Sequence, residues 1–445
     1  MKVIVIGGVA SGMSAASKIK RNDKSAEVIV YEAGEHLSYG ACGLPYYISG
    51  INDDSNKLIA RTESEFNKSG IETRIKHKVL KVIPERKEIF IHDSINNQLF
   101  IDSYDKLLIA TGAVATVPPI EGRDLKGVYH LKTLSDGLFL KKLLEENACK
   151  NIVIVGGGYI GLEVAETLKE QGKNITVIEY SHDILAPFDK EISQEAVKEL
   201  VNLGINLKLQ EGVTKILGNS DGDAVEVVTD KGRYSTDLVI LATGIKPATN
   251  FLKGSGINLR SNGAIIIDRE MRTNVPDIYA AGDCAEVYHL VKEENDYIPL
   301  GTTANKCGRI AGDNMLGAHQ KFVGTMGSAA IKIGNLELAR TGLSEHEAKK
   351  LSYDYDTVTV MSQDHPNYYP NPTSIKLKLI YEKRTLRLLG AQGVGEKGVV
   401  LRIDMFAIAI QNKMATNEIG MVDLCYAPPF AGVWDAVHIA SNAAK

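Results

Sequence analysis

One pattern occurs twice in this chain: an apolar run, a glycine-rich loop, a helix-like segment, a second apolar run and a glutamate. The first copy occupies residues 3–32 and the second residues 152–179. Short apolar runs without alternation are typical of strands that are buried on both faces of a parallel sheet. The repeat therefore predicts two α/β units, each with a glycine turn between a strand and a helix.

The second copy contains a complete G-x-G-x-x-G pattern, at Gly156, Gly158 and Gly161. The first glycine permits a tight turn, the second lets the backbone approach a pyrophosphate, and the third lets the helix pack closely on the strand. Glu179 follows at the spacing at which a carboxylate binds both ribose hydroxyls of NAD. A 2′-phosphate would be repelled there, so the pattern favours NADH over NADPH. The alternative, a tight turn with an incidental acid, is disfavoured by the apolar runs on both sides.

The first copy is less regular, because Val9 stands where the middle glycine belongs between Gly7 and Gly12. Alone, it could be an ordinary α/β turn. Glu32 lies at the ribose-binding distance, and a later apolar run ends in Gly282-Asp283. Because the aspartate of such a pair can hold the ribityl chain of a flavin, we predict that the first copy binds FAD.

Cys42 lies in a glycine-containing segment shortly after Glu32, and Pro45 suits the first turn of a following helix. A nearby helix N-terminus predicts a lowered thiol pKa and a reactive thiolate. The alternative is a buried structural cysteine, which the glycines and the neighbouring flavin site make less favoured. The next cysteine is Cys149, so this segment cannot form an internal dithiol. The redox partner of Cys42 must therefore come from a substrate, or be oxygen on its own sulfur.

Composition excludes several other classes of protein. The chain has 445 residues and a net charge of -4, without a basic cluster, which argues against nucleic-acid binding. No apolar run approaches the roughly 18–20 residues that span a bilayer. The five cysteines form no CxxC pair, so we expect a reduced, cytoplasmic chain. No metal site is predicted.

The tripeptide Ala-Thr-Gly occurs twice, at 110–112 and 242–244, each time after an apolar run. We predict that the chain passes between the two units at these points. The predicted domains are an FAD-binding domain at 1–112 and 245–324, an NAD(P)H-binding domain at 113–244, and an α+β module at 325–445. The last shows an alternating strand at 375–379 and an apolar helix near 399–411.

The sequence resembles the pyridine nucleotide-disulfide oxidoreductases over nearly its whole length. The matching stretches are VIVIGGVASGMSAA, SYGACGLPYYISG, LLIATGA, IVIVGGGYIGLEVAE, LATGIKP, IYAAGDCAE, HPNYYP and CYAPPF. Within that family it resembles the single-cysteine branch, which contains coenzyme A-disulfide reductases, NADH oxidases and NADH peroxidases. The resemblance to coenzyme A-disulfide reductases is the strongest. The resemblance implies two Rossmann-like dinucleotide-binding domains, for FAD and NAD, and a C-terminal α+β dimerisation domain.

The resemblance also implies residue roles. Cys42 would be the redox-active cysteine, and Tyr159 would swing out of the nicotinamide pocket. Tyr368 and Tyr426 would enter the partner subunit's active site of a homodimer as proton donors. The alternative for both tyrosines is packing against proline-rich loops. The cofactor-binding set is Gly7, Gly12, Glu32, Thr111, Gly112, Asp283 and Ala304 for FAD, and Gly156, Gly158, Tyr159, Gly161, Glu163, Glu179 and Gly244 for NAD.

Ala10 stands where the peroxidases and oxidases of this branch carry a histidine, so the acid–base group of oxygen chemistry is missing. Ser14, Lys18 and Arg21 share one helical face near Ser38 and would bind the phosphates of coenzyme A; an ordinary solvated face is an equal alternative. Ala41 replaces an asparagine common in coenzyme A-disulfide reductases, which leaves persulfides and polysulfides open as substrates.

Three functions remain. The first is an FAD-dependent NAD(P)H oxidoreductase that reduces a disulfide, persulfide or polysulfide, coenzyme A disulfide foremost, through a mixed disulfide on Cys42. The second is an NADH oxidase that reduces oxygen to water or hydrogen peroxide through a Cys42 sulfenic acid. The third is a non-catalytic, NADH-responsive flavoprotein. A further possibility is that Cys425, beside Tyr426, lies near the active site as a second thiol.

Overall fold

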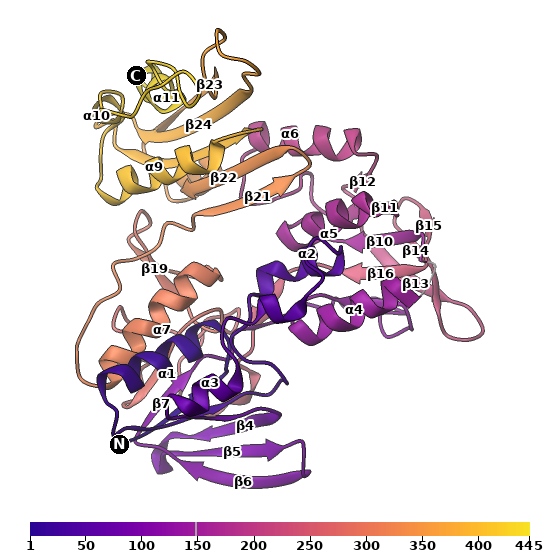
Figure 1. Ribbon diagram of the computed structural model, residues 1–445, viewed down its shortest axis with the longest axis vertical. Helices are drawn as coiled ribbons and strands as arrows, with labels where there is room; N and C mark the ends of the chain where they lie inside the picture. The colour runs from indigo at the N-terminus through magenta and orange to yellow at the C-terminus, as the bar shows by residue number, and fades with distance from the viewer. Residues whose placement is uncertain (147–148) are drawn as a thin grey trace.

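The computed structural model describes residues 1–146 and 149–445, and its chain forms two parallel-sheet units and a C-terminal antiparallel module (Figure 1). The predicted α/β fold class is confirmed. The helices of the first unit are α1 (Ala10–Asn22), α3 (Glu63–Lys68) and α7 (Gly301–Met315), whereas α2 (Leu44–Ile48) packs on helices of the second unit. Short 3-10 turns lie at Ala41–Gly43, Ser55–Leu58, Pro84–Arg86 and Asn250–Leu252.

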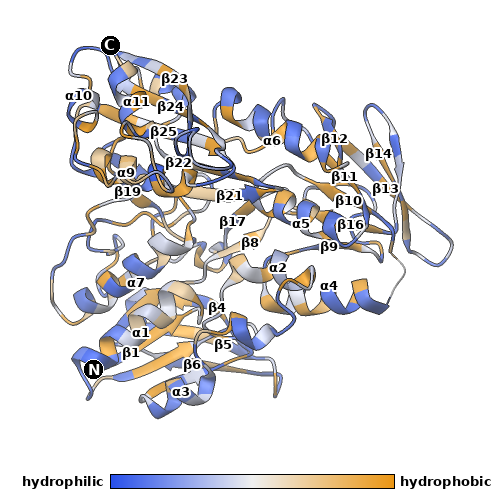
Figure 2. Ribbon diagram, turned by 45° about the horizontal axis from the view of Figure 1, so that its top comes forward, coloured by the Kyte–Doolittle hydropathy of each residue, from blue (hydrophilic) through white to orange (hydrophobic). Residues whose placement is uncertain are grey.

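The first parallel sheet has the strand order β18-β7-β1-β2-β3. Its strands are β1 (Lys2–Ile6), β2 (Glu27–Tyr31), β3 (Ile71–Arg74), β7 (Lys106–Ile109) and β18 (Ile278–Ala280). The helices α1 and α7 pack together on one face, and an antiparallel sheet of β4 (His77–Ile83), β5 (Glu88–Asp93) and β6 (Gln98–Ser103) lies below the other (Figure 1). Both faces of the strands are thereby covered, which explains their unbroken apolar sequence, drawn orange for β1 in Figure 2.

The second parallel sheet has the order β12-β11-β10-β16-β9. Its strands are β9 (Val128–His130), β10 (Asn151–Val155), β11 (Asn174–Glu179), β12 (Asn206–Leu209) and β16 (Leu238–Leu241). Ile152 and Ile154 face the helices α4 (Leu134–Glu146), α5 (Tyr159–Glu170) and α6 (Lys190–Asn202). Val153 and Val155 face the antiparallel strands β13 (Val213–Gly218), β14 (Ala224–Thr229) and β15 (Arg233–Ser235).

The chain crosses between the two units after each of the two Ala-Thr-Gly tripeptides. The outgoing segment β8 (Ala113–Ala115) pairs antiparallel with the returning segment β17 (Ile245–Pro247). After the return, β19 (Val287–His289) and β20 (Glu294–Asp296) form a short hairpin. The predicted crossings are therefore found side by side.

The C-terminal module is an antiparallel sheet with the order β21-β22-β25-β24-β23. Its elements are β21 (Ala329–Ile333), β22 (Leu336–Gly342), α8 (Glu345–Lys350), β23 (Tyr355–Gln363), β24 (Ser374–Glu382), β25 (Leu388–Gly395), α9 (Val399–Gln411), α10 (Thr416–Ile419) and α11 (Ala436–Ala443). The apolar helix and the alternating strand expected here are α9 and β24. The helix α9 packs on β22 and β25 around a core of its own.

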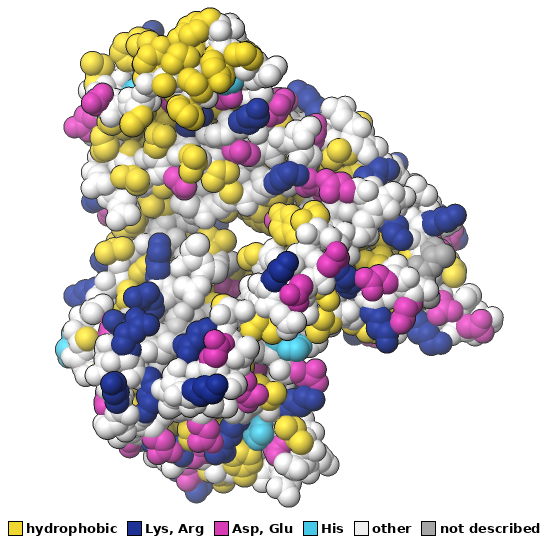
Figure 3. Space-filling model, in the orientation of Figure 1, with side chains coloured by type: hydrophobic (Ala, Val, Ile, Leu, Met, Phe, Trp, Pro, Cys, Tyr) yellow, Lys and Arg dark blue, Asp and Glu magenta, His cyan; other side chains and the backbone are white. Residues whose placement is uncertain are grey.

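The outer surface of this module is unusually apolar, as Figure 3 shows at its top. Exposed side chains there are Met361, Tyr368, Leu401, Ile408, Met421, Phe430, Val433 and Trp434. A concentration of exposed apolar side chains on a folded chain marks a contact surface. The longest described helix, α7, has 15 residues, and none of the described helices can span a bilayer.

Candidate functional site

A single cavity of about 2190 Å³ runs along the carboxyl ends of both parallel sheets. Both glycine loops and Cys42 are in its lining. The carboxyl edge is where open α/β sheets bind ligands, because the loops that follow the strands meet there. The two predicted nucleotide sites and the cysteine are therefore parts of one continuous space.

The first glycine loop is shaped by two close backbone approaches. Gly7 has φ +105, and a Cβ there would lie 2.2 Å from the Ala110 carbonyl oxygen. A Cβ on Gly12 would lie 1.9 Å from the oxygen of Gly7, so the helix can press on the strand only with glycine at this position. Val9, by contrast, has φ -106, outside the left-handed region that favours glycine. The missing middle glycine therefore leaves the turn itself intact.

The second glycine loop repeats this geometry. Gly156 has φ +114, and its Cβ would meet the Ala242 oxygen at 2.4 Å; a Cβ on Gly161 would meet the Gly156 oxygen at 2.1 Å. Gly158 differs, because a Cβ there meets nothing within 4 Å. Its backbone faces open cavity, as the approach of a ligand requires.

The helices that begin at these loops, α1 and α5, have no side-chain cap and no acidic residue in their first turn. The short helices α3 and α8 both carry a capping box. The first N–H groups of a helix need acceptors, which a phosphate supplies. The residues present thus fit two dinucleotides.

A glutamate closes each loop in the same way. Glu32 accepts hydrogen bonds from the N–H groups of Gly8 at 2.7 Å and Gly34 at 2.6 Å. Glu179 accepts them from Gly157 at 2.6 Å and Ser181 at 2.7 Å. Both carboxylates lie at the carboxyl end of the strand that follows the glycine loop and its helix, and both line the cavity. Each is therefore at the place from which an acid binds a ribose.

Other residues predicted for the cofactors are also in the lining. They are Thr111, Gly112, Asp283 and Ala304 for the first site and Tyr159, Glu163 and Gly244 for the second. Gly12 and Gly161 are absent from it, consistent with their packing role.

Cys42 lies in the 3-10 turn Ala41–Gly43, directly before α2, and Pro45 is in the first turn of that helix as expected. Its side chain is open to the cavity. The expected lowering of the thiol pKa is wrong for the chain without cofactors. Burial by the surrounding protein and the Glu163 carboxylate raise the pKa of Cys42, and Lys132 offsets them only in part. The helix-end argument considered only neighbours in sequence, whereas Glu163 arrives from α5.

Glu163 has a perturbed carboxyl group. Burial and the neighbouring Glu166 raise its pKa to about 7. Lys132 Nζ lies 3.6 Å from an oxygen of Asp283. The charges of both residues act on the Cys42 thiol. Lys132 could not be predicted from the sequence because it belongs to no motif. It comes close to Cys42 only because the fold brings the second unit, to which Lys132 belongs, against the first. Cys42 is the one cysteine in the lining among the residues that the structure describes.

The proposed coenzyme A residues Ser14, Lys18, Arg21 and Ser38 lie outside the cavity lining. Ser14 Oγ donates to Asn305 Oδ1 at 2.7 Å, and Lys18 Nζ lies 3.3 Å from Asp313 Oδ1. The face that they share therefore contacts α7 in part, and of the four residues only Arg21 is exposed. Their role stays a prediction.

Tyr368 and Tyr426 are also outside the lining, but the structure brings them together. Their hydroxyl oxygens are 2.7 Å apart, and both side chains are exposed on the apolar surface of the C-terminal module. No pattern in the sequence predicts this contact between two residues that are 58 positions apart. Cys425 is exposed beside them.

Residues 1–306 match the family described as pyridine nucleotide-disulphide oxidoreductase, and residues 328–437 match its dimerisation domain. An NAD(P)H sulfur oxidoreductase (CoA-dependent) from Pyrococcus abyssi is 39% identical over 100% of this chain and 98% of its own length. A coenzyme A disulfide reductase from Staphylococcus aureus is 30% identical over 100% of both chains. The water-forming NADH oxidase from Lactobacillus brevis, solved with NADH, is 31% identical with a TM-score of 0.96, covering 100% of this chain and 98% of its own. The resemblance read from the motifs is confirmed: this chain belongs to the pyridine nucleotide-disulphide oxidoreductases.

Proposed function

We propose that this enzyme uses FAD and NADH to reduce a disulfide, persulfide or polysulfide, with coenzyme A disulfide as the best-supported substrate. One observation carries the proposal: Cys42 is the one cysteine that lines a cavity shared by both glycine loops, among residues 1–146 and 149–445. A lone sulfur can cycle only with a sulfur supplied by a substrate, or with oxygen. The names of the Pyrococcus and Staphylococcus relatives support the sulfur-bond reading.

The predicted domains assign the cofactors. Residues 1–112 and 245–324 would hold FAD, with Glu32 at the ribose and Asp283 at the ribityl chain, and residues 113–244 would hold the nicotinamide dinucleotide. When bound, FAD accepts a hydride from NADH and supplies an electron pair to sulfur. Glu179 favours NADH, because its carboxylate would repel a 2′-phosphate.

Cys42 is the nucleophile of the proposed cycle. Its thiolate attacks one sulfur of the substrate disulfide, a new S–S bond forms, and the other sulfur leaves as a thiolate. An electron pair then cleaves the mixed disulfide, which returns Cys42 as thiolate and releases the second thiol. The balance is one NADH and one proton consumed for two thiols released. Because burial and Glu163 raise the thiol pKa, Lys132 is the positive charge that favours the thiolate.

The departing thiolate needs a proton donor, and we assign this role to Tyr426 and Tyr368 of a second subunit. Within one chain both tyrosines are outside the cavity, on the apolar surface that matches the family's dimerisation domain. A homodimer would cover that surface. Ser14, Lys18, Arg21 and Ser38 are the candidate contacts for the phosphates of coenzyme A. The five cysteines are unpaired in this structure, which supports a reducing, cytoplasmic location.

A second candidate is an NADH oxidase that forms a Cys42 sulfenic acid, because the structurally similar Lactobacillus protein bears that name. Ala10 argues against it, because the loop beside Cys42 then lacks an imidazole that could protonate a peroxide oxygen.

The test compares two acceptors with one enzyme. Under anaerobic conditions with NADH, we expect stoichiometric thiol release from coenzyme A disulfide, faster than oxygen uptake measured in air without a disulfide. Cys42→Ser should abolish thiol release while keeping flavin reduction by NADH, and Cys425→Ser serves as the matched control. Thiol release by Cys42→Ser would contradict the proposal, and oxygen uptake faster than thiol release would favour the oxidase.

A further inference from the structure

Three residues of the cavity lining carry a buried polar atom that has no hydrogen-bond partner among the described residues: Thr111 (Oγ1) beside the first glycine loop, and Tyr159 (hydroxyl) and Arg340 (Nε) toward the second. Arg340 is only 8% exposed, and its N–H cannot turn to bulk water. Buried donors are nearly always paired, so an unpaired one indicates a partner that arrives in another state.

The strand register brings Arg340 toward the start of α5, where Tyr159 lies. Ile331 of β21 pairs with Leu338 of β22, and both belong to the core that packs on α5 and includes Tyr159 at its edge. The next pair on the same face is Ala329 with Arg340, two residues nearer the cavity. Ala329 and Tyr159 both line the cavity.

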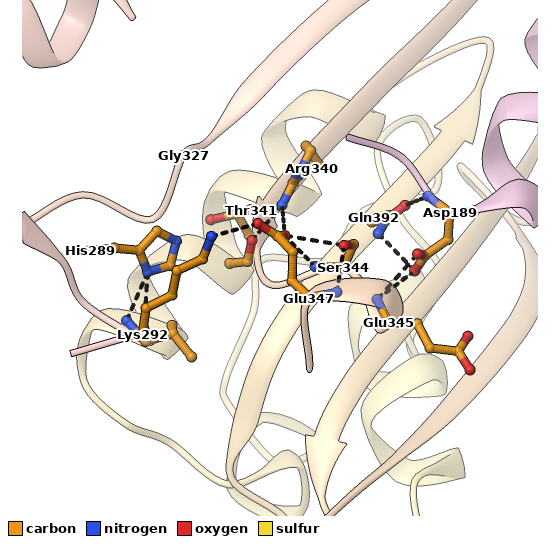
Figure 4. A network of polar contacts seen from close by, with 12 residues as sticks. Asp189, His289, Lys292, Gly327, Arg340, Thr341, Ser344, Glu345, Glu347 and Gln392 are labelled. Atoms are coloured by element: carbon orange, nitrogen blue, oxygen red, sulfur yellow. Dashed lines mark hydrogen bonds and ion pairs between the residues drawn. The ribbon is translucent and has the colours of Figure 1, made fainter. Parts of the chain in front are cut away.

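Arg340 is held in place by one of its other nitrogens, Nη2. Its Nη2 donates to the Gly342 oxygen at 2.6 Å and to Glu347 Oε2 at 3.0 Å. Glu347 also accepts from Lys292 Nζ at 2.7 Å and from the N–H of Ser344 (Figure 4). Burial alone would raise the pKa of Glu347, but Arg340 and Lys292 hold it at about 2, so the carboxylate is charged.

The Glu347 carboxylate thus already balances the charge of the Arg340 guanidinium. The free Nε therefore suits a neutral hydrogen-bond acceptor rather than a second anion. Burial raises the pKa of Tyr159 to about 12, which keeps its hydroxyl neutral with free lone pairs.

We propose that Arg340 is a positioning residue for Tyr159: when nicotinamide displaces the phenol ring, the tyrosine hydroxyl accepts a hydrogen bond from Arg340 Nε. This inference rests on the proposed binding of NADH at the second glycine loop. The displaced tyrosine gains a partner that it lacks in the present structure, so the contact lowers the dissociation constant of the nucleotide. It also links cofactor binding on α5 to the C-terminal module, through Glu347 on α8.

Arg340→Lys keeps a charge for Glu347 and removes the Nε donor, and Tyr159→Phe removes the acceptor. Arg387→Lys is the matched control, because Arg387 also has an unpartnered buried Nε but is not in the cavity lining. Calorimetry of the oxidised holoenzyme with tetrahydro-NADH, which transfers no hydride, measures binding without turnover.

Each single variant should weaken binding about 3- to 10-fold, the effect of one hydrogen bond. The double variant should bind no more weakly than either single one, since both remove the same contact. Arg387→Lys should match the wild type. Wild-type binding by Arg340→Lys, or losses that multiply in the double variant, would overturn the role of Arg340. If the wild type neither binds the analogue nor is reduced by NADH, the proposed function itself fails.

Discussion

Gly158 and Gly161 lie three residues apart in the second loop, and an added methyl group should affect them in opposite ways. Gly158 has φ -85, which alanine adopts readily, and its Cβ would enter open cavity. The Cβ of Gly161 would lie 2.1 Å from the Gly156 backbone oxygen and 3.3 Å from Ala242 Cβ. The first substitution therefore tests the ligand, and the second tests the fold.

For Gly158→Ala, stability should change by less than about 1 kcal/mol, because the weaker N-cap offsets the lower entropy of the unfolded chain. If the pyrophosphate approaches this backbone, the methyl group displaces one hydrogen bond to a charged group, about 1.5–3 kcal/mol. NADH binding should weaken roughly 10- to 150-fold. For Gly161→Ala, overpacking costs about 1–3 kcal/mol, and the better helix propensity returns about 1 kcal/mol at most.

Stopped-flow rates of flavin reduction against NADH concentration give the dissociation constant, and thermal denaturation of the FAD-free proteins ranks their stability. We expect Gly158→Ala to melt with the wild type and bind NADH poorly, and Gly161→Ala to melt earlier. A Gly158→Ala enzyme that keeps the wild-type dissociation constant would refute the placement of the pyrophosphate.

Three further predictions concern charges. Glu179→Ala should raise the KM for NADH and lower that for NADPH, in steady-state assays with each nucleotide; unchanged selectivity would contradict the assigned ribose contact. Glu163 has a folded-state pKa of about 7, above the ordinary 4.5, so the folded chain retains a proton that the unfolded chain has lost between these values. Its contribution to stability should therefore fall as pH rises from about 4.5 to 7, and Glu163→Gln, denatured with urea at pH 5 and pH 8, should show less of this decline. Lys378 is 1% exposed and contacts Asp189 at 3.3 Å, Glu191 at 3.1 Å and Glu345 at 2.6 Å, so Lys378→Met should destabilise by about 3–5 kcal/mol. Lys376, which pairs with Glu195, is 20% exposed, so Lys376→Met should cost less, below about 1 kcal/mol; equal losses for the two variants would contradict the importance of the buried network.

The parts of the site that depend on local geometry could be predicted from the sequence. The glycines of both loops specify turns that only glycine permits, as Gly7 and Gly156 illustrate with their positive φ values. The position of Glu32 and Glu179 beside the glycine loops could also be predicted, because neighbouring parallel strands end at the same edge of a sheet. Two α/β units and an apolar α9 could be predicted for the same reason: the apolar runs and the glycine loops are patterns within short segments of the sequence.

The remaining features depend on contacts between distant segments. The thiol pKa of Cys42 is set by burial and by Glu163, which a helix-end argument cannot include. Arg340 carries no motif, and its place in the cavity wall follows from the pairing of β22 with β21. The contact between Tyr368 and Tyr426 likewise joins two loops of the C-terminal module that periodicity cannot align.

The central claim is that one sulfur, Cys42, carries the substrate covalently. Peptide mass spectrometry of the enzyme, reduced with NADH and then given one equivalent of coenzyme A disulfide without oxygen, tests it directly. The account predicts a single coenzyme A adduct on the peptide that contains Cys42, removed by further NADH. An adduct confined to Cys425, or none on Cys42 while thiol is released, would contradict it.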